Sequence, residues 1–479
     1  MEDKDKKQDH KIPTFIVAGL QGDAGKTLLS IGLVRAYTRE FGFNVGAFKK
    51  GPDYIDAAWL SQAAGSKARN LDTFMMSQDM ILHSFGRHNI DKDISIIEGN
   101  RGLFDGLDIK GTHSTAQLAK ILNVPVLLVV NIVKVTRTAV AMVLGCQHLD
   151  PDIRLMGVIL NRYSTLRHKK IVSDAIEEEC HVPVLGAIPA FKDEQLLPDR
   201  HLGLITPAEH HTMTQTIETV ASKIQQHCDL KKILTLARKS APSRLSKITS
   251  PFEFQGHTSK QALKIGYFSD SAFTFYYPEN LEILAREGVE LVPISSLDAP
   301  ELPVVHALYI GGGFPETHAA QLSGNQSLMA SIRNAVQKGM PVYAECGGLI
   351  YLSRQLIYKG RVFPMAAVFP VTTIMKEKPQ GHGYVIARVT RENPFFQVGT
   401  ELKGHEFHYS TVVPAESEVD TAFEMLRGTG AYSGHDGLIT KNVLATYIHL
   451  HALGTPQWAE ALIRAAIQYK SSCQPAIKE

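Results

Sequence analysis

The sequence predicts an α/β protein of two domains, and three observations lead to this fold class. Its 479 residues exceed the size of one ordinary hydrophobic core, and 44% of them are hydrophobic. Continuous apolar runs such as 94–97 and 124–130 alternate with helical periodicity, as in parallel strands that are buried on both faces. A second α/β series starts at 262, after a stretch rich in Ser, Pro and Lys. We therefore expect domains at 1–238 and 262–479 with a linker at 239–261.

The stretch 15–28 is typical of a strand, a glycine-rich loop and the start of a helix. Glycines let backbone N–H groups point inward and the helix adds its positive dipole end, so such a loop can bind phosphates. Lys26 would reach the β- and γ-phosphates of a nucleotide, and Thr27 would bind Mg²⁺. The usual loop has four residues between its glycines, whereas Gly19 and Gly25 enclose five, so we expect a longer variant. A glycine-rich corner that binds nothing is the alternative.

The charge balance argues against a large surface for polyanions. Lys and Arg number 50 and Asp and Glu number 48, which leaves no electrostatic footprint for nucleic acid or an anionic membrane. The charged N-terminal stretch is followed by no apolar segment of signal-peptide or membrane-span type. The five cysteines are odd in number and lack metal-ligand spacing, as in a reducing compartment. We expect a cytoplasmic protein without nucleic-acid or membrane partners.

Polar clusters follow the predicted strands of the first domain at their carboxyl ends. Residues 49–56 follow a strand at 44–48, and residues 98–106 follow a strand at 94–97. Ligands of parallel sheets bind at this edge, so the acidic side chains of both clusters are candidate ligand contacts. Each of these acids has the alternative of a solvated loop residue or a helix cap.

In the second domain a short strand runs directly into Cys346, two glycines and an apolar helical stretch. This is the layout of a nucleophile elbow, in which a tight turn exposes a thiol beneath a helix N-terminus. We expect the helix dipole to lower the pKa of this thiol; a buried structural cysteine is the alternative. Backbone N–H groups at two strand ends are candidate oxyanion donors: Gly312, Gly313 and Gly347. Four histidines are candidate bases: His405, His408, His449 and His451.

These clusters together resemble the cobyrinate a,c-diamide synthase family, which includes hydrogenobyrinate and nickel-sirohydrochlorin a,c-diamide synthases. The resemblance covers nearly the whole chain. It rests on the phosphate loop and on residues 49–56, 69–72, 98–106, 276–280, 311–316, 344–348 and 404–410. It implies a P-loop NTPase-like parallel-sheet domain, similar to dethiobiotin synthetase, followed by a class I glutamine amidotransferase α/β domain. Two segments depart from the family pattern: 21–24, where serine is usual, and 100–101, where small apolar residues are commoner.

For the first domain the resemblance implies an ATP- and Mg²⁺-dependent ligase that activates a carboxylate as an acyl phosphate. The implied nucleotide contacts lie in the loop and at a later strand end: Gly22, Gly25, Lys26, Thr27 and Asn161. For Asn161, a turn-forming role is the alternative. Thr27 and Glu98 are expected to bind the metal. Residues near the strand ends are expected to contact the substrate: Asp53, Tyr54, Ile55 and Asp105.

For the second domain the resemblance implies that Cys346 attacks glutamine, forms a thioester and releases ammonia. His449 matches the position of the family's base, and His451 is its competitor. The expected partners are a tetrapyrrole dicarboxylate, glutamine and ATP. A homodimer is compatible with the sequence.

The expected function is amidation of the a- and c-acetate carboxylates of cobyrinate, in cobalamin biosynthesis. Nickel sirohydrochlorin is the alternative substrate, and the motifs neither separate the two nor fix the central metal. Cobyric acid synthase, which amidates four other side chains, is disfavoured by residues 53–56 and by the ending 449–451. A partition-type P-loop ATPase with an inert second domain is an alternative from another class, and the position of Cys346 argues against it.

Overall fold

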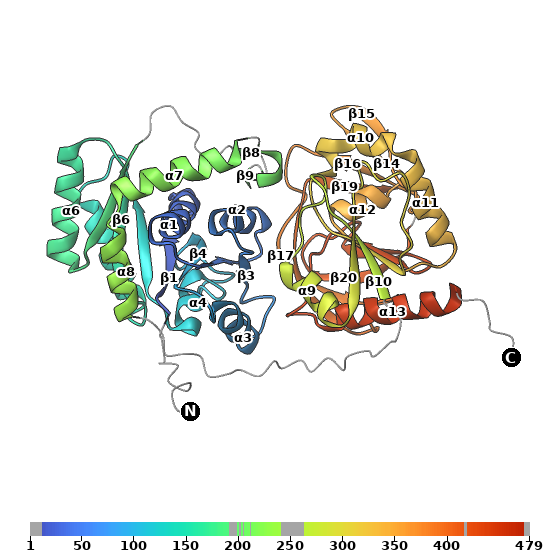
Figure 1. Ribbon diagram of the computed structural model, residues 1–479, viewed down its shortest axis with the longest axis horizontal. Coiled ribbons are helices and arrows are strands. Elements are labelled where there is room, and N and C mark those ends of the chain that lie inside the picture. The colour runs from blue at the N-terminus through green and yellow to red at the C-terminus, as the bar shows by residue number, and fades with distance from the viewer. Residues whose placement is uncertain are drawn as a thin grey trace, which may run out of the picture. The chain divides into compact units, whose positions relative to one another are not determined.

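A computed structural model describes residues 12–190, 199–200, 203–204, 206–210, 212–240, 263–415 and 419–473. The chain divides into two compact units, Met1–Pro251 and Phe252–Glu479 (Figure 1). Most of the predicted linker at 239–261 lies outside the described residues, so its limits stay a prediction.

The first unit contains a seven-stranded sheet in which every neighbouring pair of strands is parallel. In sheet order the strands are β3 (Arg69–Leu71), β2 (Val45–Lys50), β4 (Ile94–Gly102), β1 (Thr14–Gly19), β5 (Val126–Asn131), β6 (Leu155–Tyr163) and β7 (Val184–Pro189). Strands β1 and β2 are buried along their whole length, as expected when helices cover both faces. The parallel sheet predicted from the apolar runs is confirmed.

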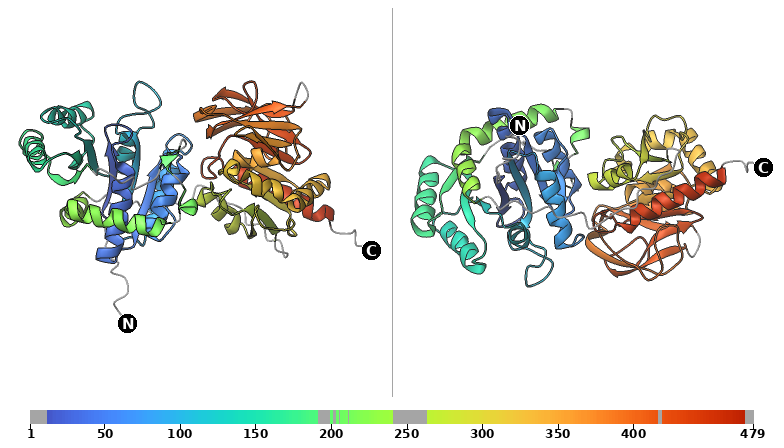
Figure 2. Two further views of the ribbon diagram at one scale, coloured as in Figure 1. Left: turned by 90° about the horizontal axis from the view of Figure 1, so that it is seen from above. Right: turned by 60° about the horizontal axis from the view of Figure 1, so that its bottom comes forward.

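The first six described helices of this unit alternate with its strands, and the last two follow one another. They are α1 (Lys26–Phe41), α2 (Tyr54–Ala64), α3 (Gln78–Asn89), α4 (Thr115–Leu122), α5 (Thr138–Leu149), α6 (Leu166–Cys180), α7 (Met213–His227) and α8 (Leu230–Lys239). Short elements are β8 (Asp199–Arg200), β9 (Gly203–Leu204) and η1 (Pro207–Glu209). Figure 1 shows α1, α2 and α7 on one side of the strands and α3 and α4 on the other, and Figure 2 gives two further views.

Helix α1 carries the end of the phosphate loop and packs closely against α7. A Cβ atom on Gly32 of α1 would lie 2.2 Å from the side chain of Ile224 in α7, so this approach requires glycine. The connections that leave β1 and its neighbour β4 run in opposite directions through the sheet order. The carboxyl ends of β1 and β4 are therefore the switch point at which ligands of such sheets bind.

The second unit is built on a nine-stranded sheet whose first half is parallel and whose second half is antiparallel. In order its strands are β11 (Val289–Ile294), β10 (Leu263–Phe268), β12 (Ala307–Ile310), β13 (Val342–Glu345), β22 (Val443–Thr446), β21 (His435–Thr440), β20 (Thr421–Arg427), β17 (Gly381–Val389) and β18 (Glu401–His408). A four-stranded sheet contains β15 (Arg361–Pro364), β14 (Gln355–Tyr358), β16 (Val371–Met375) and β19 (Ser410–Pro414).

Helices of the second unit join and flank these strands. They are α9 (Pro278–Arg286), η2 (Pro315–His318), α10 (Ala319–Gly324), α11 (Gln326–Gln337), α12 (Gly347–Leu352) and α13 (Gln457–Cys473). Strand β13 lies between β12 and β22, and its four residues are all buried. The turn that follows β13 therefore starts from the interior of the sheet. Within the described ranges, none of the helices combines the length and apolar character needed to cross a membrane.

Candidate active sites

The phosphate loop connects β1 to α1 and is held by a residue from a distant strand. Gly25 has a left-handed backbone with φ 94°, and α1 begins at the next residue. The side-chain amide of Asn161, on β6, donates a hydrogen bond of 2.8 Å to the carbonyl of Ala24. A Cβ atom on residue 25 would lie 2.3 Å from this same amide nitrogen. Both the left-handed backbone and this close approach therefore require glycine at position 25. Asn161 thus fixes the loop; its contact with a nucleotide base stays a prediction.

The loop leaves donors where a phosphate would bind. No side chain caps the N-terminus of α1, so its first N–H groups can bind an anion. Gly22 is exposed, with no atom within 4 Å of its Cβ position. The ammonium of Lys26 turns back onto the loop and donates to the carbonyl of Gln21 at 3.0 Å. Burial and the charge of Lys49 lower the pKa of Lys26.

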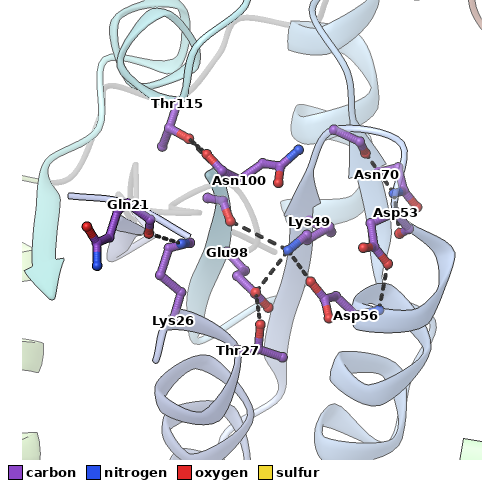
Figure 3. Close-up of polar contacts among 12 residues, drawn as sticks. Gln21, Lys26, Thr27, Lys49, Asp53, Asp56, Asn70, Glu98, Asn100 and Thr115 are labelled. Atoms are coloured by element: carbon purple, nitrogen blue, oxygen red, sulfur yellow. Dashed lines mark hydrogen bonds and ion pairs between the residues drawn. The ribbon is translucent and has the colours of Figure 1, made fainter. Parts of the chain in front are cut away.

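Thr27, Lys49, Asp56 and Glu98 form one polar cluster beside the loop (Figure 3). The Thr27 hydroxyl donates to Glu98 Oε1 at 2.6 Å, and Lys49 Nζ donates to the same oxygen at 2.9 Å and also to Asp56. Burial raises the pKa of Glu98 to about 7. Burial opposes the charge of Lys49, but the carboxylates of Asp56 and Glu98 hold its pKa above the ordinary value.

The cluster fits a divalent cation at the pair predicted for it. Glu98 is fully buried, and its Oε2 atom has no hydrogen-bond partner among the described residues. A buried carboxylate oxygen of this kind, beside the Thr27 hydroxyl, is suited to Mg²⁺. In the described parts of the chain no group of three His, Cys, Asp or Glu side chains could hold a metal alone. The remaining ligands would therefore be phosphate oxygens and water, as is usual for Mg²⁺.

Lys49 was given no role from the sequence. It is the last residue but one of β2 and lies beside Glu98 on β4, and the register of these two strands pairs the two residues directly. The signal available in the sequence was a second lysine at a strand end next to a cluster of acids. Only strand order shows that β2 neighbours β4, so the pairing with Glu98 was not predictable from spacing.

The residues predicted to contact the substrate lie around the start of α2 and after β4. Asp53 caps α2, because its carboxylate accepts a hydrogen bond of 2.9 Å from the N–H of Asp56. Burial and the charge of Asp56 raise the pKa of Asp53 to about 6. Tyr54 is half-buried and Ile55 is buried. Exposed Asp105 accepts from the N–H of Gly102 at 2.9 Å and so stabilises the turn after β4. Their contacts with a substrate stay predictions.

A cavity of about 370 Å³ adjoins the phosphate loop. Its lining comes from the loop itself, from the end of β5 with the following turn, and from α5: Leu20, Gln21, Ala24, Asn131, Val133, Val135 and Met142. Most of these side chains are apolar, as is common in pockets for small organic groups.

The elbow predicted at Cys346 has the strained backbone that such turns require. Cys346 has φ 47° and ψ −94°, a conformation that is rare for a residue with a Cβ atom. Its N–H donates to the carbonyl of Thr446 at 2.7 Å, which ties the turn to β22. The sulfur lies 3.9 Å from the carbonyl oxygen of Phe407.

The expected lowering of the thiol pKa by the helix dipole is wrong. Burial, together with the carboxylates of Glu316 and Glu345, raises the pKa of the Cys346 thiol, although the N–H of Gly347 acts in the opposite direction. Helix α12 contains only six residues, so its dipole is small compared with the desolvation of a fully enclosed thiol. The thiol therefore needs a base to become a nucleophile.

The three glycines predicted as oxyanion donors lie together, but their N–H groups differ. The N–H of Gly312 already donates to the carbonyl of Phe275, at 3.3 Å. A Cβ atom on Gly347 would lie 3.1 Å from the nitrogen of Gly313, so these two backbones approach each other next to Cys346. Gly313 and Gly347 are thus the better placed donors of the three.

The four candidate histidines occupy different environments. His449 Nδ1 lies 3.3 Å from Glu345 Oε2, and the Cε1–Nε2 edge of the ring faces Gly312. His451 Nδ1 accepts from the N–H of Leu453 at 3.2 Å, and its Nε2 lies 3.6 Å from Glu279 Oε2. His405 stacks on His449, and His408 stacks on Tyr447 and donates from Nδ1 to the carbonyl of Ser410. His449 is the histidine beside the glycine cluster.

A phosphate loop on one α/β unit and a cysteine elbow on the other define the class of the protein as a two-domain, glutamine-dependent amide ligase. Comparison with known proteins agrees with this class. Residues 15–205 match the CobQ/CobB/MinD/ParA nucleotide binding domain, and residues 264–457 match the CobB/CobQ-like glutamine amidotransferase domain.

Three relatives that carry the name cobyrinate a,c-diamide synthase align over almost the full chain. The protein of Magnetococcus marinus is 41% identical over 97% of this chain and 100% of its own length. Those of Archaeoglobus fulgidus and Methanobrevibacter smithii are 40% and 39% identical, over 96% and 94% of this chain and 98% of their own lengths. The chain belongs to the cobyrinate a,c-diamide synthase family. The family resemblance, the fold class and the ligase class predicted from the sequence are confirmed.

Proposed function

We propose that this enzyme converts the a- and c-acetate carboxylates of cobyrinate into amides, consuming ATP and glutamine for each. The observation that carries the proposal is the cluster of Thr27, Lys49 and Glu98 beside a phosphate loop, in the same chain as the Cys346 elbow. The first site can activate a carboxylate, and the second can release ammonia. Relatives of the same name over nearly the full chain support cobyrinate as the substrate.

In the first unit the substrate carboxylate oxygen attacks the γ-phosphorus of ATP, and the bond from this phosphorus to the bridging oxygen breaks. ADP leaves and an acyl phosphate remains. Lys26 and Lys49 supply the positive charge that stabilises the transferring phosphoryl group. When bound by Thr27 and Glu98, Mg²⁺ would neutralise phosphate charge and orient the nucleotide. The apolar cavity beside the loop would accept the nucleobase, and Asn161 would keep the loop in place.

In the second unit the Cys346 thiol gives its proton to His449, and the sulfur attacks the side-chain amide carbon of glutamine. The N–H groups of Gly313 and Gly347 stabilise the oxyanion. His449 returns the proton to the leaving nitrogen, which departs as ammonia, and water then hydrolyses the thioester to glutamate. Ammonia attacks the acyl phosphate carbon, and phosphate leaves as the amide forms.

Substrate contacts come from the start of α2 and from the turn after β4 in this proposal. Asp53, Tyr54 and Ile55 lie at the carboxyl edge of the sheet next to the Lys49 cluster, and Asp105 lies on the neighbouring turn. A cytoplasmic location belongs to the proposal as well, since all five cysteines are free. The homodimer stays a prediction, which light scattering on the full chain can check.

The experiment that tests the function offers cobyrinate, hydrogenobyrinate and nickel sirohydrochlorin in parallel and identifies the products by mass spectrometry. We expect the diamide of cobyrinate. Exclusive amidation of nickel sirohydrochlorin would reassign the substrate, and the absence of any glutamine hydrolysis would favour the partition-type ATPase.

A matched pair of cysteine variants assigns the nitrogen route in the same assay. Cys346→Ser should lose glutamine-driven synthesis, because an alcohol ionises far less readily than a thiol, and should keep ammonia-driven synthesis. Cys473→Ser, an exposed cysteine at the end of α13, should keep both. Loss of both activities in folded Cys346→Ser protein would mean that this cysteine is no dedicated glutaminase nucleophile.

A further inference from the structure

Glu345 is a fully buried carboxylate with no role in the steps above. It is the last residue of β13 and directly precedes Cys346. Its Oε2 atom lies 3.3 Å from Nδ1 of His449 and accepts from the Tyr309 hydroxyl at 3.3 Å. Its Oε1 atom accepts from the N–H of Leu450, also at 3.3 Å. Both carboxylate oxygens therefore have hydrogen-bond partners: Oε1 has the backbone N–H of Leu450, and Oε2 has the ring of His449 and the hydroxyl of Tyr309.

This arrangement determines which nitrogen of His449 carries the proton. A carboxylate can only accept, so the nitrogen that faces it, Nδ1, must donate. The lone pair is then on Nε2, and the Cε1–Nε2 edge faces Gly312, in the glycine cluster beside Cys346. That nitrogen can accept a proton from a thiol.

The neighbouring histidine has the opposite arrangement. Nδ1 of His451 accepts a hydrogen bond from the N–H of Leu453, so its proton is on Nε2, which faces Glu279 at 3.6 Å. The lone pair of His451 is therefore on Nδ1, where it already accepts from the N–H of Leu453, and its Nε2 carries the proton. Two buried carboxylates contact two histidines on one loop, but only the contact from Glu345 leaves a base.

We infer that Glu345 is the positioning residue of the glutaminase: it holds His449 in the Nδ1–H form and stabilises the imidazolium that forms when the Cys346 proton reaches Nε2. The inference rests on the proposed function of the second unit. No atom of Glu345 reacts; the proton moves from sulfur to Nε2 and later to the departing ammonia.

The surroundings of the thiol explain why such a residue is needed. Burial raises the pKa of Cys346, and the charge of Glu345 itself adds to this effect. The carboxylate therefore opposes an isolated thiolate and favours only a thiolate paired with imidazolium. His405, which stacks on His449 with ring centroids 4.9 Å apart, adds no charge, because burial lowers its pKa well below the ordinary value.

The test compares Glu345→Gln with Glu279→Gln in the full chain, the same change at the two carboxylates that face His449 and His451. In Glu345→Gln the new side-chain amide would donate to Nδ1 of His449, so the ring proton would move to Nε2. Nε2 would then have no lone pair to accept the proton of Cys346. We expect the glutaminase kcat to fall about tenfold to a hundredfold, with the KM for glutamine within about twofold of wild type. Glu279→Gln should keep the wild-type kcat.

The rate at which iodoacetamide alkylates Cys346 distinguishes a positioning role of Glu345 from a merely structural one, because the two roles predict opposite changes in this rate. A merely structural carboxylate raises the thiol pKa, so its neutralisation would accelerate alkylation. If Glu345 acts through His449, alkylation of the Glu345→Gln variant becomes slower than in the wild type. Faster alkylation, or an unchanged kcat, would overturn the inference.

The protonated nitrogen of His449 can also be measured in the wild-type protein, without any variant. If Glu345→Gln does not fold, as judged by near-ultraviolet circular dichroism, nitrogen NMR of histidine-labelled wild-type protein reports the His449 form directly. A proton on Nε2 would overturn the inference and one on Nδ1 would support it. Failure of the proposed function is recognised separately, because wild-type protein would then release no glutamate from glutamine.

Discussion

Gly312→Ala places one methyl group against the ring of the proposed base. The new Cβ atom would lie 2.5 Å from Cε1 and 3.3 Å from Nε2 of His449. Ordinary contacts between carbon atoms start near 3.5 Å, so the ring has to retreat by about 1 Å. His405 stacks on one face of the ring and Glu345 holds its Nδ1 edge, so the ring cannot retreat without losing one of these contacts.

A displacement of this size in a reacting group costs about a hundredfold in rate, and we expect that loss in the glutaminase kcat of Gly312→Ala. The backbone of Gly312 does not have a positive φ, so alanine adds no conformational strain. The assay measures glutamate release and, separately, amidation driven by ammonia, which should persist. Gly324→Ala is the matched control, because nothing lies within 4 Å of its Cβ position at the exposed end of α10. A wild-type glutaminase rate in Gly312→Ala would refute the placement of His449 against this glycine.

Three further predictions concern the ligase site, the substrate and stability. Lys26→Ala should lose synthesis from both glutamine and ammonia by about a thousandfold or more, since both need the acyl phosphate; near-normal turnover with ammonia would contradict this. Asp53→Asn keeps a good helix cap, so the protein should fold but accumulate a monoamide, detected by mass spectrometry. Weaker ATP binding with unchanged products would instead move Asp53 to the metal site. Burial raises the pKa of Asp436 to about 7 from an ordinary 3.8, so the folded state keeps a proton that the unfolded chain releases, and wild-type stability falls as pH rises between these values. Asparagine at this position cannot ionise, so the Asp436→Asn variant should not lose this stability. We expect the free energy of unfolding of the variant, relative to that of the wild type, to be about 2–3 kcal/mol higher at pH 8 than at pH 5 in urea unfolding. The same relative value at both pH values would refute the assignment.

The parts of the fold that the sequence predicted are those with a continuous apolar signal. Strands β4 and β5 are buried in nearly every residue, and such runs cannot be surface loops. The antiparallel half of the second sheet was not predicted, because its strands alternate between buried and exposed residues and contain glycines and charges. Strand β18, for example, alternates in its first half, and its pairing with β17 depends on contacts distant in sequence.

The candidate site was predicted where one residue and its neighbours carry the chemistry, as at Cys346 and in the loop around Lys26. It was incomplete where two strands had to be placed side by side. Lys49 meets Glu98 only because β2 pairs with β4, and Glu345 meets His449 only because β13 pairs with β22. The thiol pKa depends on burial in three dimensions, which a helix start in the sequence does not reveal.

The position of β1 at the centre of the first sheet also has a consequence for the folding of this unit during synthesis. Strand β1 is entirely buried in the folded unit, yet its partners β4 and β5 follow it in the chain only after helices α1, α2 and α3. During synthesis an apolar strand with two open edges therefore precedes everything that will cover it. Any fragment that ends before Val126 lacks β5 and keeps at least one of these edges unpaired, and such fragments are prone to aggregation.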